Sequence, residues 1–188
     1  MGKIPSVSLP SQITCRPCAC WKKCYAHKLE RLRPTVAAAY QRNLEVLMND
    51  PETYWREVEA AVMTSRFFRF HVSGDIPDLE YLFQMVRIAE RNPHCEILCF
   101  TKKYELVNGY LDADCMLPRN LHLVFSGWKG LPMDNPYSLP EAHVLYRDGS
   151  TTARPDAREC PGNCTECAVT DSGCWTLTDG EQVVFHEH

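Results

Sequence analysis

Residues 67–101 read FFRFHVSGDIPDLEYLFQMVRIAERNPHCEILCFT, and this stretch decides the fold. It opens on a strand-like run, 67–72, which leads into the polar turn SGD at 73–75. Asp78 then caps a helix that has an apolar stripe on one face, and a second apolar run at 97–101 predicts the next strand. A strand, a helix and a strand joined by short turns are typical of a parallel sheet built by crossover connections.

The same alternation extends on both sides of this stretch. We predict helices over 28–48 (broken at Pro34) and 51–64, then a short helix over 104–111 and strands over 121–125 and 142–146. These elements indicate an α/β fold with a parallel sheet. Since no repeat or low-complexity linker interrupts the pattern, we predict one domain, 1–188, made of a Cys-rich segment 1–27, an α/β core 28–150 and a second Cys-rich segment 151–188.

The composition limits the function classes. The 188 residues include 20 basic and 24 acidic side chains, so the net charge of −4 gives no general affinity for nucleic acid. No apolar run is long enough for a membrane span, and the first residues do not resemble a signal peptide. We therefore expect a cytoplasmic protein. In that reducing compartment disulfides explain the 11 cysteines poorly, and an odd number cannot all pair internally.

Eight of the cysteines form two terminal groups with ligand-like spacing. The N-terminal cysteine group has the pattern C-x2-C-x-C-x3-C and consists of Cys15, Cys18, Cys20 and Cys24. The C-terminal cysteine group has the pattern C-x3-C-x2-C-x6-C and consists of Cys160, Cys164, Cys167 and Cys174. Such short spacings let several sulfurs turn toward one centre. The other three, Cys95, Cys99 and Cys115, have no such spacing, and we expect them to be structural.

The spacings favour iron–sulfur clusters over zinc. Zinc sites usually use two C-x2-C pairs separated by a longer loop, and the C-terminal group has one such pair, Cys164 and Cys167. A disulfide remains a weaker alternative. In the N-terminal group, three ligands would leave one iron open for a substrate or cofactor, whereas a fourth ligand would close the cluster. The spacing leaves open whether Cys18 is a ligand.

Polar residues follow three consecutive predicted strands. Because ligands bind beyond the carboxyl ends of parallel strands, we expect a cofactor or small-molecule site there. Its candidate residues are His71, Ser73, Gly74, Asp75, Thr101, Lys102 and Ser126. Each has a structural alternative when taken alone: Asp75 could close a turn, and His71 could be a hydrogen-bonded core residue. Their common position favours the functional interpretation.

The segment 16–42 is locally basic. Its one acidic residue is Glu30, and its basic residues are Arg16, Lys22, Lys23, Lys28, Arg31, Arg33 and Arg42. The excess could bind nucleic acid. A charged helix face that also balances the charge of a thiolate-bound cluster explains it better, because no recognisable nucleic-acid-binding module accompanies it.

The motifs TCRPCACWKKCYA, FRFHVSGDI, LCFTKK and CPGNCTECAV resemble those of the phage-encoded gene product 88 family. The resemblance extends from about Ser8 to Phe185. It implies a protein of phages or of bacteria that carry prophages, and hence the cytoplasm of a bacterial host.

A more distant similarity is to radical S-adenosylmethionine proteins. It implies a partial (β/α) barrel with a [4Fe–4S] cluster at its open end, bound by Cys15, Cys20 and Cys24. The turn Ser73-Gly74-Asp75 would then contact the methionine amino group of S-adenosylmethionine. The C-terminal cysteine group would resemble the auxiliary cluster domains of some of these enzymes.

Three hypotheses follow. The first is an iron–sulfur protein with one or two [4Fe–4S] clusters and a radical-S-adenosylmethionine-like core that acts on a small molecule. The second is a non-enzymatic cluster protein that serves a redox partner or a structural role. The third is a zinc-stabilised phage protein that binds nucleic acid through the segment 16–42.

Overall fold

A parallel β-sheet organises the computed structural model, which describes residues 4–15 and 18–187. Within these residues the sheet has seven strands in the order β1-β2-β3-β4-β5-β7-β6, and every neighbouring pair is parallel. β1 and β6 are the two outermost strands and do not pair with each other, so the sheet remains open. This confirms the predicted α/β class with a parallel, partial-barrel-like sheet. The strands are β1 (Ser6–Val7), β2 (Phe67–Phe70), β3 (Glu96–Thr101), β4 (Leu121–Ser126), β5 (Glu141–Leu145), β6 (Arg158–Glu159) and β7 (Gln182–His186).

The helices begin where the sequence provides start signals. Pro34 and Pro51 occupy the first turns of their helices, and the side chains of Asp50 and Asp78 accept hydrogen bonds from backbone N–H groups of the helices that they cap (3.1 and 2.8 Å). The helices are α1 (Ser11–Thr14), α2 (Tyr25–Leu32), α3 (Pro34–Asn49), α4 (Pro51–Met63), α5 (Leu79–Arg91), α6 (Tyr104–Asp112) and α7 (Cys164–Val169), with 3₁₀ turns η1 (Trp21–Lys23) and η2 (Gly173–Trp175).

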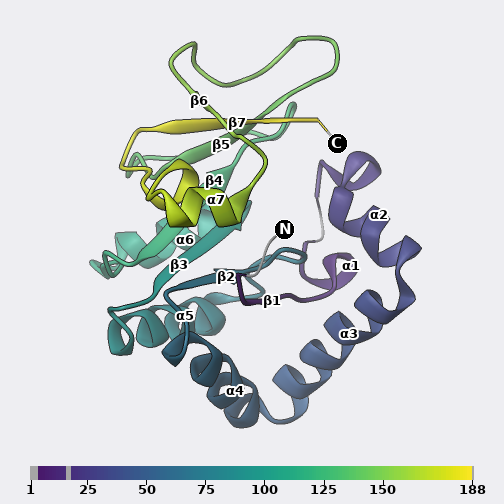
Figure 1. The fold of residues 1–188 in the computed structure, drawn as a ribbon, viewed down its shortest axis with the longest axis vertical. Coiled ribbons are helices and arrows are strands. Elements are labelled where there is room, and N and C mark those ends of the chain that lie inside the picture. The colour runs from purple at the N-terminus through teal and green to yellow at the C-terminus, as the bar shows by residue number, and fades with distance from the viewer. Residues whose placement is uncertain (1–3, 16–17, 188) are drawn as a thin grey trace.

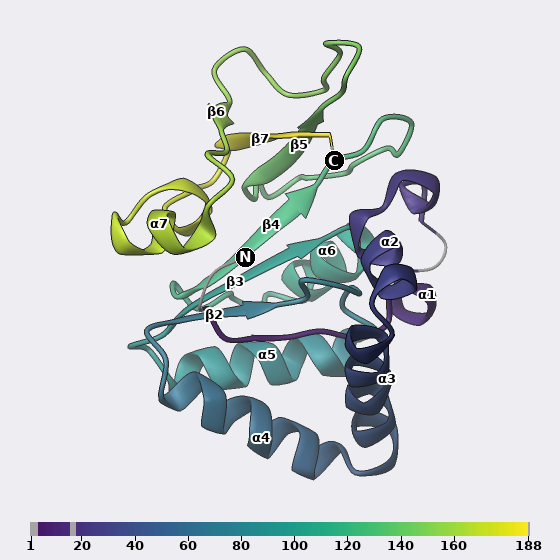
Figure 2. The same cartoon turned by 45° about the vertical axis from the view of Figure 1, so that its right-hand side comes forward.

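The two faces of the sheet have different covers (Figure 1, Figure 2). Helices α4, α5 and α6 pack on the larger core, which includes Phe68, Phe70 and Phe125. The opposite face carries Leu98 and Val124, and α7 and η2 pack against it. The C-terminal cysteine group therefore lies on the face that the long helices leave uncovered.

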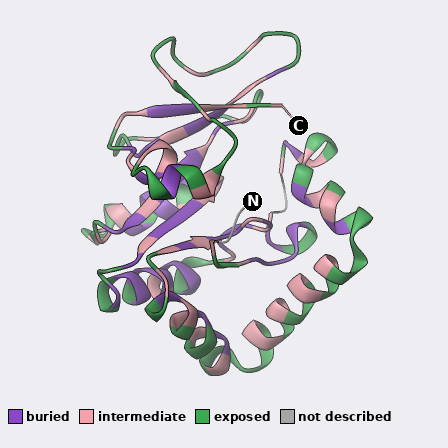
Figure 3. Cartoon of the chain, in the orientation of Figure 1, coloured by how far each residue is buried: buried purple, intermediate pink, exposed green. Residues whose placement is uncertain are grey.

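Burial agrees with the structural role expected for the three cysteines between the groups. Cys95 and Cys99 are fully buried, and Cys115 is partly buried against the same core. By contrast α3 contains no buried residue, and Figure 3 shows its surface as intermediate and exposed. Helix α3 is thus a peripheral connection between α2 and α4.

Several elements differ from the sequence-based expectation. Strand β2 ends at Phe70 because the next residue, His71, has a left-handed backbone with φ +58°. Strands β1, β6 and β7 and helices α1 and α7 were not predicted. All five have only two to six residues, which is too short for a periodic pattern.

The carboxyl ends of β2, β3 and β4 meet at one edge of the sheet, and α1 and α2 lie beside that edge (Figure 2). The N-terminal cysteine group belongs to the segment between β1 and α2, so the chain delivers it to this edge. Among the described residues, no helix combines the length and the apolar character that crossing a membrane requires.

Candidate functional site

The turn after β2 holds the segment that carries the N-terminal cysteines. The carbonyl of Ser73 accepts a hydrogen bond from the N–H of Leu9 (3.1 Å), and the N–H of Asp75 donates to Thr14 Oγ1 (3.0 Å). Gly74 lies between them with φ +83°, and a Cβ atom there would be only 2.7 Å from both Leu9 O and Thr14 Oγ1. The predicted residues Ser73, Gly74 and Asp75 therefore anchor α1 to the end of β2.

The Asp75 carboxylate joins the ends of β2 and β3. It accepts hydrogen bonds from Thr101 Oγ1 (2.6 Å), from the N–H of Lys102 (2.9 Å) and from the N–H of Ile76 (2.8 Å). Burial raises the pKa of Asp75, although these hydrogen bonds and the Lys102 charge act in the opposite direction. Three donors therefore satisfy this buried carboxylate and join the two strand ends.

Lys102 extends the site to the end of β4. Its Nζ donates a hydrogen bond to Ser126 Oγ (2.8 Å), and Tyr104 Oη donates to the carbonyl of Ser126 (2.5 Å). The structure thus brings Asp75, Thr101, Lys102 and Ser126 together, as the sequence predicted. Tyr104 was not predicted, because its position in a helical run showed no sign of a polar role.

The four N-terminal cysteines lie in this same environment. Cys18 Sγ is 2.7 Å from Cys20 Sγ, and both Cys18 and Cys24 raise the pKa of Cys20. The positive charge of Lys102 lowers the pKa of every thiol in the group, and the charge of Asp75 raises that of Cys15. Cysteines from one segment and charged residues from two strand ends therefore form a single site.

The thiols of this site differ in acidity. Hydrogen bonding with Cys20 lowers the pKa of Cys18 and of Cys24 to about 6, and the same contacts raise the pKa of Cys20. Burial raises the pKa of Cys15 to about 12. Cys18 and Cys24 are consequently the sulfurs that reach the thiolate form, the form that binds metal, most readily at neutral pH.

The C-terminal cysteines gather around a different residue, Arg69 of β2. One guanidinium nitrogen, Nη1, lies 3.7 Å from Cys164 Sγ. Burial raises the pKa of Cys160 and raises that of Cys174 to about 12, while the Arg69 charge lowers both. The charges of Cys164 and Cys167 also raise the pKa of each of these two thiols. Within residues 4–15 and 18–187, however, no three His, Cys, Asp or Glu side chains are already arranged to hold a metal ion.

One predicted residue, His71, occupies other surroundings. The ring of His71 is buried beside Phe70 and Tyr81 (ring centroids 5.9 and 5.3 Å apart), and burial lowers its pKa to about 3. Arg16 lies outside the described residues. The other basic residues of the segment 16–42 are exposed on η1, α2 and α3 and at the junction of the two helices: Lys22, Lys23, Lys28, Arg31, Arg33 and Arg42.

Glu30 is the one acidic residue of that segment, and it points inward. It is 7% exposed, and its Oε1 accepts hydrogen bonds from the N–H of Ser11 (3.0 Å) and from Ser73 Oγ. Glu30 therefore joins α2, α1 and the turn after β2. Its isolation among basic residues was a signal for this role that the sequence contained.

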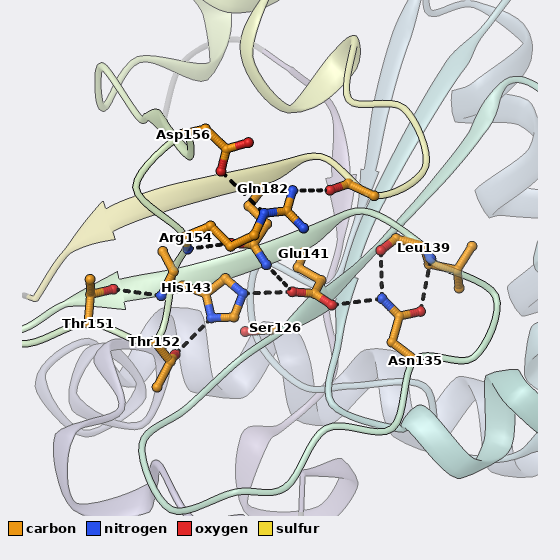
Figure 4. A network of polar contacts seen from close by, with 12 residues as sticks. Ser126, Asn135, Leu139, Glu141, His143, Thr151, Thr152, Arg154, Asp156 and Gln182 are labelled. Carbon is orange, nitrogen blue, oxygen red and sulfur yellow. Dashed lines mark hydrogen bonds and ion pairs between the residues drawn. The ribbon is translucent and has the colours of Figure 1, made fainter.

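A second polar network lies on β5 and β7 (Figure 4). His143 Nε2 is 2.9 Å from Glu141 Oε2, and His143 Nδ1 is 2.8 Å from Thr152 Oγ1. Asn135 and Gln182 donate further hydrogen bonds to the Glu141 carboxylate (2.9 and 2.5 Å). Burial alone would raise the pKa of Glu141, but these hydrogen bonds outweigh burial and lower it.

We expect Glu141→Gln to lower the free energy of unfolding by about 1–3 kcal/mol at pH 7, because an amide cannot accept all of these hydrogen bonds. A depressed folded-state pKa contributes stability that is present above the ordinary value of 4.5 and is lost as the pH falls through the folded-state value. The gap between wild type and variant should therefore close at acidic pH. Urea unfolding between pH 3 and 7 measures it.

Glu159→Gln is the matched control, since Glu159 pairs with His186 at 2.6 Å in an exposed position. We expect it to change stability by less than about 0.5 kcal/mol at any pH. An equal loss in both variants would contradict the assignment of Glu141 to a buried network.

A family model described as Gene product 88 matches residues 2–129, which is more than half of the chain. The match contains the N-terminal cysteine group, Arg69 and the strand-end residues from Ser73 to Ser126, and it stops before the C-terminal cysteine group. No curated protein and no solved structure matches the chain.

Proposed function

The chain belongs to the phage gene product 88 family, and we propose that it is an iron–sulfur protein whose N-terminal cysteines hold a [4Fe–4S] cluster beyond the carboxyl ends of β2, β3 and β4. The observation that supports this best is the position of four thiols in one site beside Lys102. Thiolates are the ligands of iron–sulfur clusters, and a nearby ammonium offsets the negative charge that they bring.

The finer proposal is a radical-S-adenosylmethionine-like enzyme in which Cys15, Cys20 and Cys24 are the ligands. The cysteine segment follows β1, the first strand of a parallel sheet, and reaches the edge where such sheets bind ligands. The cofactor would supply one-electron chemistry. Lys102 and Ser126 would then orient a small molecule at this edge, while Asp75 and Thr101 keep the strand ends in place.

One contact favours a second candidate function. The Cys18 sulfur lies within hydrogen-bonding distance of the Cys20 sulfur, so Cys18 is close enough to serve as a fourth ligand. A fourth thiolate would close the cluster to substrates. The protein would then transfer electrons or use the cluster structurally. In either case we place it in the cytoplasm of a bacterial host.

The test begins with anaerobic purification followed by iron, sulfide and zinc analysis. We expect a brown protein, and we expect Cys20→Ser and Cys24→Ser each to lose one cluster, about four iron atoms per chain. Cys115→Ser is the matched control, because Cys115 is partly buried away from both groups and should keep all the iron. A colourless protein loaded with zinc would overturn the proposal.

Cys18→Ala separates the two candidate functions. Full retention of iron in this variant indicates three ligands, and the reduced wild-type protein should then cleave S-adenosylmethionine to 5′-deoxyadenosine. Loss of the cluster in Cys18→Ala together with no cleavage by the wild type indicates a closed, non-enzymatic cluster.

A further inference from the structure

We infer that the C-terminal cysteine group is a second, separate metal centre, closed by four thiolates, and that Arg69 is its counter-cation. The group lies beyond residue 129, where the family match ends. The inference goes beyond the proposed function and does not depend on it, because the two cysteine groups use different residues and lie at different parts of the sheet.

The packing of the segment supports such a centre. Cys160, Cys167 and Cys174 all pack with the same small core on the face opposite α4 and α5, although up to 14 positions separate them in the sequence. The N–H of Gly162 is 3.4 Å from Cys160 Sγ, so a backbone donor already faces one sulfur. Trp175 Nε1 donates to the carbonyl of Cys164 (3.4 Å) and thereby ties η2 to α7.

Gly173 shows how closely the chain approaches one of the thiols. Its backbone has φ +63°, and a Cβ atom at this position would be 2.8 Å from Cys167 Sγ. Any other residue would push this sulfur away or change the turn. Glycine at position 173 therefore allows the backbone to approach the Cys167 sulfur this closely.

Arg69 provides the charge that such a centre needs. Four neighbouring thiolates, one buried (Cys167) and three partly buried, are unfavourable without a nearby cation. The Arg69 guanidinium lies 3.7 Å from Cys164 Sγ and over the ring of Phe100 (5.1 Å to the centroid), so an aromatic face fixes it beside the sulfur. Its position on β2, the strand next to the edge strand β1, places this cation under α7.

The chemistry of the donors limits the metal to a thiophilic one. Four cysteine sulfurs bind either a [4Fe–4S] cluster or Zn²⁺. Among the described residues, no three His, Cys, Asp or Glu side chains are already arranged around one ion. Metal binding must therefore change the conformation of the segment 160–174. Gly162 and Gly173 supply the backbone freedom for that adjustment.

The central experiment uses a full-length variant without the N-terminal group: Cys15→Ser, Cys18→Ser, Cys20→Ser and Cys24→Ser together. We expect it to retain one metal centre after anaerobic purification. Metal analysis then identifies iron with sulfide or zinc. Absence of metal in this variant, while the wild type binds one centre, overturns the inference and leaves the proposed N-terminal cluster standing.

Thiol alkylation with mass spectrometry on the wild-type protein tests the same point without any substitution. The four C-terminal cysteines should resist alkylation until a chelator is added, whereas Cys115 should react equally with and without it. Equal reactivity of the C-terminal thiols with and without chelator overturns the inference.

Two matched pairs test Arg69 and Gly173. Arg69→Met should speed metal loss to a chelator at least about tenfold, which corresponds to about 1.4 kcal/mol. Arg66→Met should not, since Arg66 lies over Phe67 but pairs with Asp171. Gly173→Ala should likewise release metal faster than Gly149→Ala, a substitution outside the segment at another glycine with positive φ, where the added Cβ meets no atom within 4 Å. Equal rates within either pair would overturn the role assigned to that residue.

Discussion

Gly74→Ala is expected to lower the free energy of unfolding by about 2–5 kcal/mol. Two costs combine at this position. A left-handed backbone is unfavourable for any residue with a Cβ by roughly 1–2 kcal/mol, and Gly74 has φ +83°. The new Cβ would also meet Leu9 O and Thr14 Oγ1 at 2.7 Å, and overpacking of this kind costs about 1–3 kcal/mol.

The consequence reaches the site, because the turn at Gly74 holds the segment with the N-terminal cysteines. If α1 moves away from the turn, the contact between Asp75 N–H and Thr14 Oγ1 is lost and Cys15, which follows α1, loses its position. We therefore expect Gly74→Ala to bind less metal as well. Urea unfolding and iron analysis of the same anaerobic preparation measure both effects.

Gly109→Ala is the control for Gly74→Ala. Gly109 is an exposed residue within α6, away from the helix ends, and an added Cβ meets no atom within 4 Å. Alanine is a better helix former than glycine, so this variant should gain about 0.5–1 kcal/mol. A similar response of the two variants would show that the close contacts of Gly74 are unimportant.

The sequence was a good guide to elements whose signals are local. Asp50-Pro51 and Asp78 mark the starts of α4 and α5 because capping and the fixed φ of proline act within one turn. Buried runs such as 97–101 identify parallel strands because both faces of such strands are covered. Short elements near the chain ends were not predicted. β1, for example, forms only because two of its residues pair with β2.

The candidate site was predictable at the level of its strand ends and not at the level of its contacts. The order of strands in a parallel sheet brings Asp75, Thr101 and Ser126 to one edge whatever the side chains do there. By contrast, the role of Arg69 depends on a segment about 95 positions away that folds back over β2. No pattern within FRF distinguishes an arginine under four cysteines from one that faces solvent.

The second large effect is expected for Glu30→Ala, which should lower the free energy of unfolding by about 2–6 kcal/mol. The Glu30 carboxylate accepts hydrogen bonds from Ser11 N–H and Ser73 Oγ in a buried position. Removal of the carboxylate leaves two buried donors without an acceptor, and each such donor costs about 1–3 kcal/mol. Urea unfolding of the anaerobically purified protein measures the loss.

Glu30→Ala should also loosen the N-terminal cysteines, because Glu30 joins α2 to α1 on either side of that group. We expect faster alkylation of Cys15 in this variant than in the wild type when both are stripped of metal. Glu45→Ala is the matched control: Glu45 is an exposed acid on α3 whose side chain contacts Gln41 at 3.2 Å, and its loss should change stability by less than about 0.5 kcal/mol. Unchanged stability and Cys15 reactivity in Glu30→Ala would mean that the cysteine segment is held by the turn after β2 alone.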